Sequence, residues 1–239
     1  MTTTTASEAQ TAATAAMGSL IASLADNKAA LGTRYGEWAV SAPTLESAVA
    51  AAAMAQDELG HARSTYPVLK ALGVEIDEQT GGGRRLGLLD DELADWTSFV
   101  AANVLVDAVL STFVAACVDS SLAQMAQRAR KVLQEEGSHK VHAEAWTRRL
   151  CRAGARQRDE LVRRLQQTWE HVARWAGPSD DAGVAAAIEA GMLRVDPATQ
   201  REQVRRWLTD LLACEGVAIE LPEPGDWSAW DSARRRWDS

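Results

Sequence analysis

Asp57-Glu58-Leu59-Gly60-His61 and Glu135-Glu136-Gly137-Ser138-His139 are the stretches that decide the fold of this 239-residue chain. Both contain Glu-x-x-His, with an acid before the glutamate and a glycine inside the motif. Residues three apart on an α-helix project from one face. Each motif therefore offers a carboxylate and an imidazole to one point, a donor set that suits iron or manganese.

The composition around these motifs favours helices. Hydrophobic residues make up 46% of the chain but aromatic residues only 5%, and there are six prolines. No stretch alternates β-branched and polar residues in the way that strands do. We therefore expect an all-α protein.

Net charge and cysteine content limit the partners and the compartment. The formal net charge is −8, which disfavours non-specific nucleic-acid binding. No uninterrupted apolar stretch is long enough to span a bilayer, and residues 1–16 lack the basic start of a secretory signal. Cys117, Cys151 and Cys214 are odd in number and widely spaced, as expected of reduced thiols. We expect a cytoplasmic protein that binds neither nucleic acid nor a membrane.

Caps and helix breakers divide the first 154 residues into four helices. We expect helices over 10–40, over 44–72 with Thr44 as the cap, from Asp90 or Asp91 to 118, and over 122–151. Residues 119–121 form a tight turn, whereas 73–89, with three consecutive glycines, form a long connection. Two helical hairpins joined by one long crossover are the connectivity of ferritin-like bundles.

The rest of the chain adds helices to this four-helix bundle. Residues 156–175, 181–192 and 197–214 have helical patterns, and the tail from 221 to 239 carries three tryptophans. Such a tail docks either on its own bundle or on a partner subunit. We expect one ferritin-like domain over 1–239, with a core bundle over about 10–154 and a C-terminal extension over 155–239.

A dinuclear site in such a bundle needs an acid from each of the two remaining helices. Counting outward from the two turns, residues 25–28 and 101–105 lie level with the motifs. Asp26 falls in the first window, with Glu37 as the alternative about 15 Å along the axis. Asp107, within one turn of the second window, is the lone acid in a long apolar run and would be costly to bury unpaired. The expected metal ligands are Asp26, Glu58, His61, Asp107, Glu136 and His139, and the catalytic residues are Glu58, His61, Glu136 and His139.

Neighbouring residues have supporting roles. Asp57 and Glu135 point about 100° away from the ligand face, so we expect them to orient partners on neighbouring helices. His142, one turn after His139, is expected beside the site or in solvent. The glycines near the site, among them Gly60 and Gly137, are consistent either with a cavity or with tight helix packing.

Four stretches of the first two helices resemble a known family. They are Leu24-Ala25-Asp26-Asn27-Lys28, Leu31-Gly32-x-Arg34-Tyr35-x-Glu37-Trp38, Ala42-Pro43-x-Leu45-Glu46 and Ala55-Gln56-Asp57-Glu58-Leu59-Gly60-His61-Ala62-Arg63. The chain resembles the phenylacetic acid catabolic family, which contains subunits of the bacterial multicomponent phenylacetyl-CoA epoxidase. The resemblance implies a ferritin-like fold. It also implies a catalytic di-iron subunit that epoxidises a CoA thioester with dioxygen, and a sister subunit that often lacks the ligands.

Together these features predict a di-iron, O2-activating monooxygenase of the epoxidase type. Two iron ions, or manganese, would be the cofactor, and an aromatic compound or a CoA thioester the substrate. The resemblance implies an external reductase as electron donor and a homo- or hetero-oligomer with a related subunit. The alternative is a non-catalytic structural subunit that partners a catalytic sister chain. A rubrerythrin- or ferritin-type oxidase fits less well, because Asp26 and Asp107 replace the usual glutamates.

Overall fold

The computed structural model describes residues 2–74, 83–232 and 234–237, and the side chains from residue 7 onward. Within this part of the chain the secondary structure is almost entirely helical, and the one sheet is an antiparallel pair of two-residue strands. The elements are α1 (Thr2–Trp38), α2 (Leu45–Ala71), η2 (Gly87–Leu89), α3 (Trp96–Ala116), α4 (Ala123–Arg152), α5 (Ala155–Val172), α6 (Ala182–Glu189), α7 (Pro197–Ala213), β1 (Trp230–Asp231) and β2 (Arg236–Trp237).

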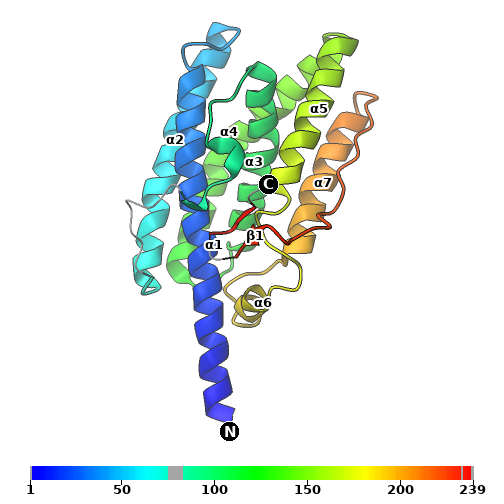
Figure 1. Ribbon diagram of the computed structural model, residues 1–239. Helices are drawn as coiled ribbons and strands as arrows, with labels where there is room; N and C mark the ends of the chain where they lie inside the picture. The colour runs from blue at the N-terminus through cyan, green and yellow to red at the C-terminus, as the bar shows by residue number, and fades with distance from the viewer. Residues whose placement is uncertain (1, 75–82, 233, 238–239) are drawn as a thin grey trace.

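The hairpins α1–α2 and α3–α4 pack together as a ferritin-like four-helix bundle, so the all-α prediction is confirmed (Figure 1). The helices α5 and α7 cover α3 from outside, and α6 packs against α1. The N-terminal turns of α1 extend beyond the body of the molecule (Figure 1). The helix α3 is thus the centre of the core, with the bundle on one side and the later helices on the other.

Two helix starts differ from the prediction. The helix α1 begins at Thr2, because the Thr- and Ala-rich segment continues the helix. The helix α3 begins at Trp96, not at Asp90 or Asp91. Asp95 accepts a 2.7 Å hydrogen bond from the Ser98 amide and caps α3, whereas Asp90 binds arginines. The predicted cap of α2 is confirmed, since Thr44 accepts from Ser47 N at 3.2 Å.

The helix α3 is long and apolar enough to span a membrane by length and composition, contrary to the sequence-based expectation. However, 78% of its most apolar window is buried inside the protein. Its partners α4, α5 and α7 provide the apolar surroundings that a bilayer would otherwise supply. This helix is therefore the core helix of the fold.

The C-terminal tail docks on its own chain, the first of the two alternatives. Trp169 of α5 donates a 2.8 Å hydrogen bond from Nε1 to the backbone oxygen of Pro222 in the tail. Arg236 donates a 2.7 Å hydrogen bond to Asp90. Arg235 is buried and donates to Ala176 O. These contacts support the single-domain organisation, which stays a prediction. Two of the three crossover glycines, at positions 81 and 82, lie outside the described residues.

Candidate metal centre

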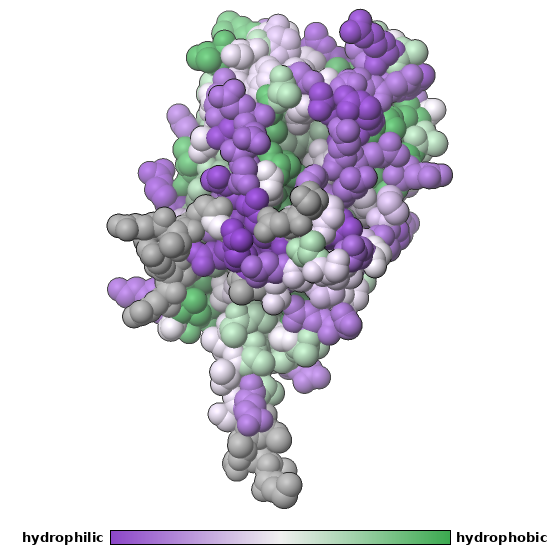
Figure 2. Space-filling view, in the orientation of Figure 1, coloured by the Kyte–Doolittle hydropathy of each residue, from purple (hydrophilic) through white to green (hydrophobic). Residues whose placement is uncertain are grey.

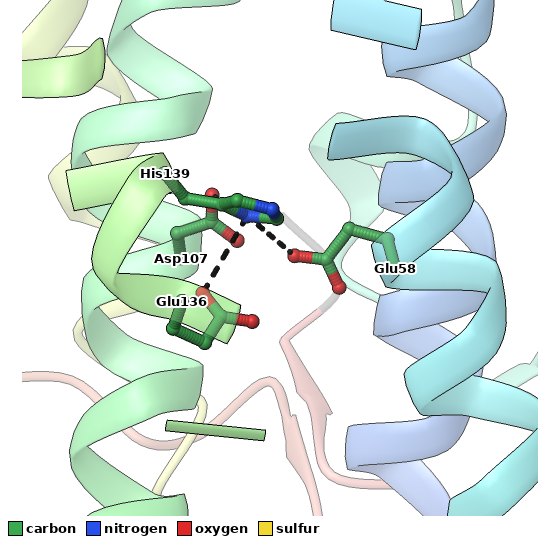
Figure 3. A group of neighbouring side chains, drawn as sticks. All are labelled: Glu58, Asp107, Glu136 and His139. Atoms are coloured by element: carbon green, nitrogen blue, oxygen red, sulfur yellow. Dashed lines mark ion pairs between the residues drawn. The ribbon is translucent and has the colours of Figure 1, made fainter. Parts of the chain in front are cut away.

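Four buried side chains converge between the two hairpins. They are Glu58 of α2, Asp107 of α3, and Glu136 and His139 of α4. One ligand atom from each lies within 4.8 Å of the others. Figure 3 shows Glu58 reaching from α2 toward His139, with Asp107 and Glu136 close beside the imidazole. The structure thus brings together at least four of the six side chains that the sequence predicted.

His61 lies at the edge of this group. Its Nδ1 is 3.2 Å from Oε1 of Glu136 and 3.8 Å from Oε2 of Glu58, and the side chain is buried. The rings of His61 and His139 have centroids 6.5 Å apart. Both Glu-x-x-His motifs therefore direct an imidazole Nδ1 toward Glu58 and Glu136, and His139 Nδ1 also lies 3.4 Å from Asp107 Oδ2.

The opposite ring nitrogens contact acids on the facing helix. His61 Nε2 lies 2.8 Å from Glu135 Oε2, and His139 Nε2 lies 3.4 Å from Asp57 Oδ2. As predicted, Asp57 and Glu135 orient partners on neighbouring helices. A carboxylate at the outer nitrogen orients each ring so that Nδ1 faces inward, an arrangement that is common around metal-binding histidines.

The helix α1 contributes neither of the acids expected from it. Asp26 is buried, but its Oδ1 accepts from Tyr66 Oη at 2.8 Å and its Oδ2 from Arg84 Nε at 3.1 Å. Burial raises the pKa of Asp26 despite these two donors. Glu37 pairs with Arg34 at 3.1 Å. The structure therefore does not bring Asp26 into the cluster, because its side chain leaves α1 on the side of the crossover segment.

Lys28 takes the place expected for an acid of α1. Its Nζ donates to Glu136 Oε1 at 2.5 Å and to Glu58 Oε1 at 2.8 Å, and it lies 3.5 Å from Asp107 Oδ1. The side chain is only 1% exposed. An ammonium group therefore lies among the carboxylates, in contact with the glutamates of both motifs.

The charges of the cluster stabilise one another. Burial disfavours the ammonium of Lys28, but Glu136 and Glu58 attract it more strongly and raise its pKa. Burial also lowers the pKa of each imidazole, yet the neighbouring carboxylates raise it to about 9 for His61 and about 11 for His139. Burial raises the pKa of Asp107, but Lys28 and His139 together more than offset this and hold it well below its usual range. When all six groups are charged, three cations face three carboxylates.

Three polar contributors escaped the sequence-based prediction. Besides Lys28, Tyr35 donates to Asp107 Oδ2 at 2.8 Å, and Asn103 Nδ2 donates to the same oxygen at 2.9 Å. The side-chain oxygen Oδ1 of Asn103 lies 2.8 Å from His142 Nδ1, so His142 is linked to the site through Asn103. The sequence contained a signal for two of these residues, because Lys28 and Tyr35 lie seven residues apart and therefore on one face of α1.

The donor set fits one metal ion better than two. The Nδ1 atoms of His61 and His139 and Oε2 of Glu58 are buried without a regular hydrogen bond among the described residues, as the ligand atoms of a cation would be. Glu58, Asp107, Glu136 and His139 could hold such an ion. A second ion would need a carboxylate from α1, where Lys28 instead places a positive charge. The residues present do not fit a dinuclear centre.

The glycines near the site serve both predicted purposes. A Cβ at Gly32 would lie 2.9 Å from Leu59 Cγ, so Gly32 permits close packing of α1 on α2. At Gly60 and Gly137 a Cβ would meet nothing within 4 Å. Gly60 borders a polar cavity of about 150 Å³ beside His61, and Gly137 a cavity of about 330 Å³ beside Glu136.

Comparison with known proteins agrees with this architecture. The family model described as "Phenylacetic acid catabolic protein" matches residues 1–239. The chain is 26% identical over 185 residues to one of the subunits of the 1,2-phenylacetyl-CoA epoxidase of Escherichia coli (strain K12), a match that covers 74% of this chain and 73% of the relative. The family match extends over the bundle and the later helices alike, so this chain belongs to the phenylacetic acid catabolic protein family.

Proposed function

We propose that this chain is a non-catalytic subunit of a multicomponent oxygenase of the phenylacetyl-CoA epoxidase type, and that it supports a metal-bearing sister chain. The family membership and the similarity to one of the epoxidase subunits support the assignment to such a complex. In this proposal the CoA thioester, dioxygen and the reductase belong to the chemistry of the sister chain. The three free cysteines are consistent with a reducing, cytoplasmic location.

The ion pairs of Lys28 carry the proposal. A buried carboxylate cluster needs cations, which either metal ions or basic side chains can supply. Here the ammonium contacts Glu58 and Glu136 directly, and both imidazoles face the same carboxylates. The cluster can therefore remain charge-balanced and buried without a metal, which suits a structural role.

An exposed apolar surface supports the proposal that this chain contacts a sister chain. Val40 is 90% exposed, Leu45 77% and Val49 62%, and all three lie at the turn between α1 and α2 or just after it. Figure 2 shows hydrophobic residues gathered at that end of a largely hydrophilic face. Apolar side chains grouped on a surface are typical of protein–protein contacts. We assign this α1–α2 end to the contact with the sister chain.

A metal-dependent oxygenase is the second possible function. The inward-facing Nδ1 atoms of His61 and His139 and the four-residue group of Glu58, Asp107, Glu136 and His139 favour it. Iron or manganese bound there would require Lys28 to leave the carboxylates or to remain beside a single ion. In that case Glu58, His61, Glu136 and His139 would be the catalytic residues, as first predicted.

Metal analysis after iron- and manganese-replete expression separates the two functions. We expect the wild-type chain to contain only substoichiometric metal. Lys28→Glu supplies the carboxylate that α1 lacks and should bind metal, with a melting temperature that rises when Fe(II) or Mn(II) is added. Lys28→Gln, which removes the charge but adds no carboxylate, is the matched control. Two iron ions per wild-type chain, bound in the presence of Lys28, would overturn the non-catalytic assignment.

A further inference from the structure

A cleft with a volume of about 330 Å³ lies beside the buried cluster, between α3, α4 and α7. The helix α7 packs mainly against α3, which leaves space between α7 and α4. Ligand cavities in proteins begin at about 300 Å³, so this cleft is large enough for a compact organic molecule.

The wall of the cleft is apolar, with Leu133 and Ala143 on α4 and Val204 on α7. Its hydroxyl groups are already engaged, since Ser111 donates to Glu136 Oε2 at 3.1 Å and Thr112 to Ala108 O at 2.7 Å. The wall therefore favours an apolar ligand body.

The inner end of the cleft disfavours an anion. Asp107 and Glu136 lie there, and their oxygens already accept hydrogen bonds from Lys28, Tyr35, Asn103 and Ser111. A negatively charged group entering this end would meet two carboxylates. An anionic ligand must therefore keep its charge at the mouth.

Lys140 provides a cation at the mouth. It is exposed and forms no ion pair within the described part of the chain; its Nζ lies 5.5 Å from the centre of the Trp207 ring. The indole is itself held by a 3.3 Å hydrogen bond from Nε1 to Glu144. The ammonium is thus located beside an aromatic wall but is available to an anion.

We propose that this cleft binds a small molecule with an apolar body and one carboxylate, the body against Leu133 and Val204 and the carboxylate at Lys140. Gly137 lines the cleft, and a Cβ at this position would touch nothing within 4 Å. A glycine inside a helix costs stability, and here it leaves the cleft free of a side chain that would point into it. The site is independent of the role of the chain as a subunit, and it needs no metal.

Calorimetric titration of the full chain, with a chelator present, tests the site with 2-naphthoate and its neutral isostere 2-naphthamide as probes. We expect the wild type to bind one equivalent of naphthoate more tightly than naphthamide. Lys140→Gln should weaken naphthoate binding about tenfold and leave naphthamide binding unchanged. Gly137→Leu, which fills the cleft, should abolish binding of both.

Gly60→Leu is the matched control, since Gly60 is also a helical glycine with free space but borders the other cavity. Ala115→Leu fills the same cleft from α3 and replaces Gly137→Leu if that variant melts early. No binding of either probe at millimolar concentration would overturn the site. Unchanged binding in both filling variants, or a retained preference for naphthoate in Lys140→Gln, would also overturn it. Because the chelator removes metals, the outcome of this titration does not depend on the metal content of the chain or on its proposed role as a non-catalytic subunit.

Discussion

Nζ of Lys28 donates a 2.8 Å hydrogen bond to Oε1 of Glu58, the glutamate of the first Glu-x-x-His motif. Both side chains are almost completely buried. The carboxylate that the motif directs into the bundle therefore contacts an ammonium group, although Glu58 also belongs to the four residues that could hold a metal. This pairing distinguishes the cluster from an ordinary dinuclear site, in which each helix contributes an acid.

Loss of the ammonium should strongly destabilise the fold. Lys28→Met leaves Glu58, Asp107 and Glu136 facing one another without their shared cation, at a cost of about 3–5 kcal/mol in the free energy of unfolding. Urea denaturation at pH 7 measures the change. Lys70→Met, at an exposed position in the last turn of α2, is the control and should differ little from wild type. A loss below about 1 kcal/mol in Lys28→Met would mean that the carboxylates are neutralised in another way.

Stability should fall as the pH rises above neutrality. The native pKa of His61 is raised to about 9 and that of His139 to about 11, from an ordinary value of 6.5. The native state therefore binds more protons than the unfolded state above pH 6.5, and the free energy of unfolding decreases with pH. The contribution of His61 is complete below pH 6.5 and is lost as the pH passes about 9.

Urea denaturation between pH 6 and about 7.5 checks this slope, below the range in which cysteine thiols titrate. His139→Gln should have a shallower slope than wild type. His171→Gln is the control, because burial lowers the pKa of His171. The contribution of His171 to stability therefore increases with pH, opposite to that of His61 and His139. A wild-type stability that rises over this range would contradict the charged state of the two imidazoles.

The helical glycines should respond differently to alanine. Gly137→Ala adds a Cβ that meets nothing within 4 Å, so it should stabilise the chain by about 0.5–1 kcal/mol through helix propensity alone. Gly32→Ala adds a Cβ 2.9 Å from Leu59 Cγ and 3.1 Å from Ala55 O, so the α1–α2 contact must open and stability should fall. Thermal melting of both variants compares the two effects directly. Equal shifts of the same sign would contradict the difference in local space.

The α1–α2 end should carry the association with the sister chain. A charge in place of an exposed apolar side chain at an interface disrupts packing, so Leu45→Asp and Val49→Asp should each weaken binding of the related metal-bearing chain about tenfold. Co-expression followed by light scattering on a sizing column reports the complex. Val141→Asp, at a 68% exposed position on α4, is the matched control. Loss of the complex in the control alone would move the contact to α4.

The sequence by itself determined the helices, the hairpin connectivity and most of the buried cluster. The capping of α2 by Thr44 follows from local hydrogen bonding. The Glu-x-x-His spacing puts Glu58 with His61, and Glu136 with His139, on single helix faces, whatever the rest of the fold does. Asp107 could be selected because a lone acid in an apolar helix needs partners.

Only the tertiary structure decided which side chain of α1 meets these residues. Counting from the turn gave the correct level, residues 25–28, but Asp26 and Lys28 are about 200° apart around the helix axis. The rotation of α1 is fixed by its packing against α2 and α6 and by the arginine of the crossover that binds Asp26, all of which are contacts distant in sequence. A local pattern specifies height along a helix and relative direction within it. The absolute direction, and with it the choice between a carboxylate and an ammonium at the centre, depends on the assembled bundle.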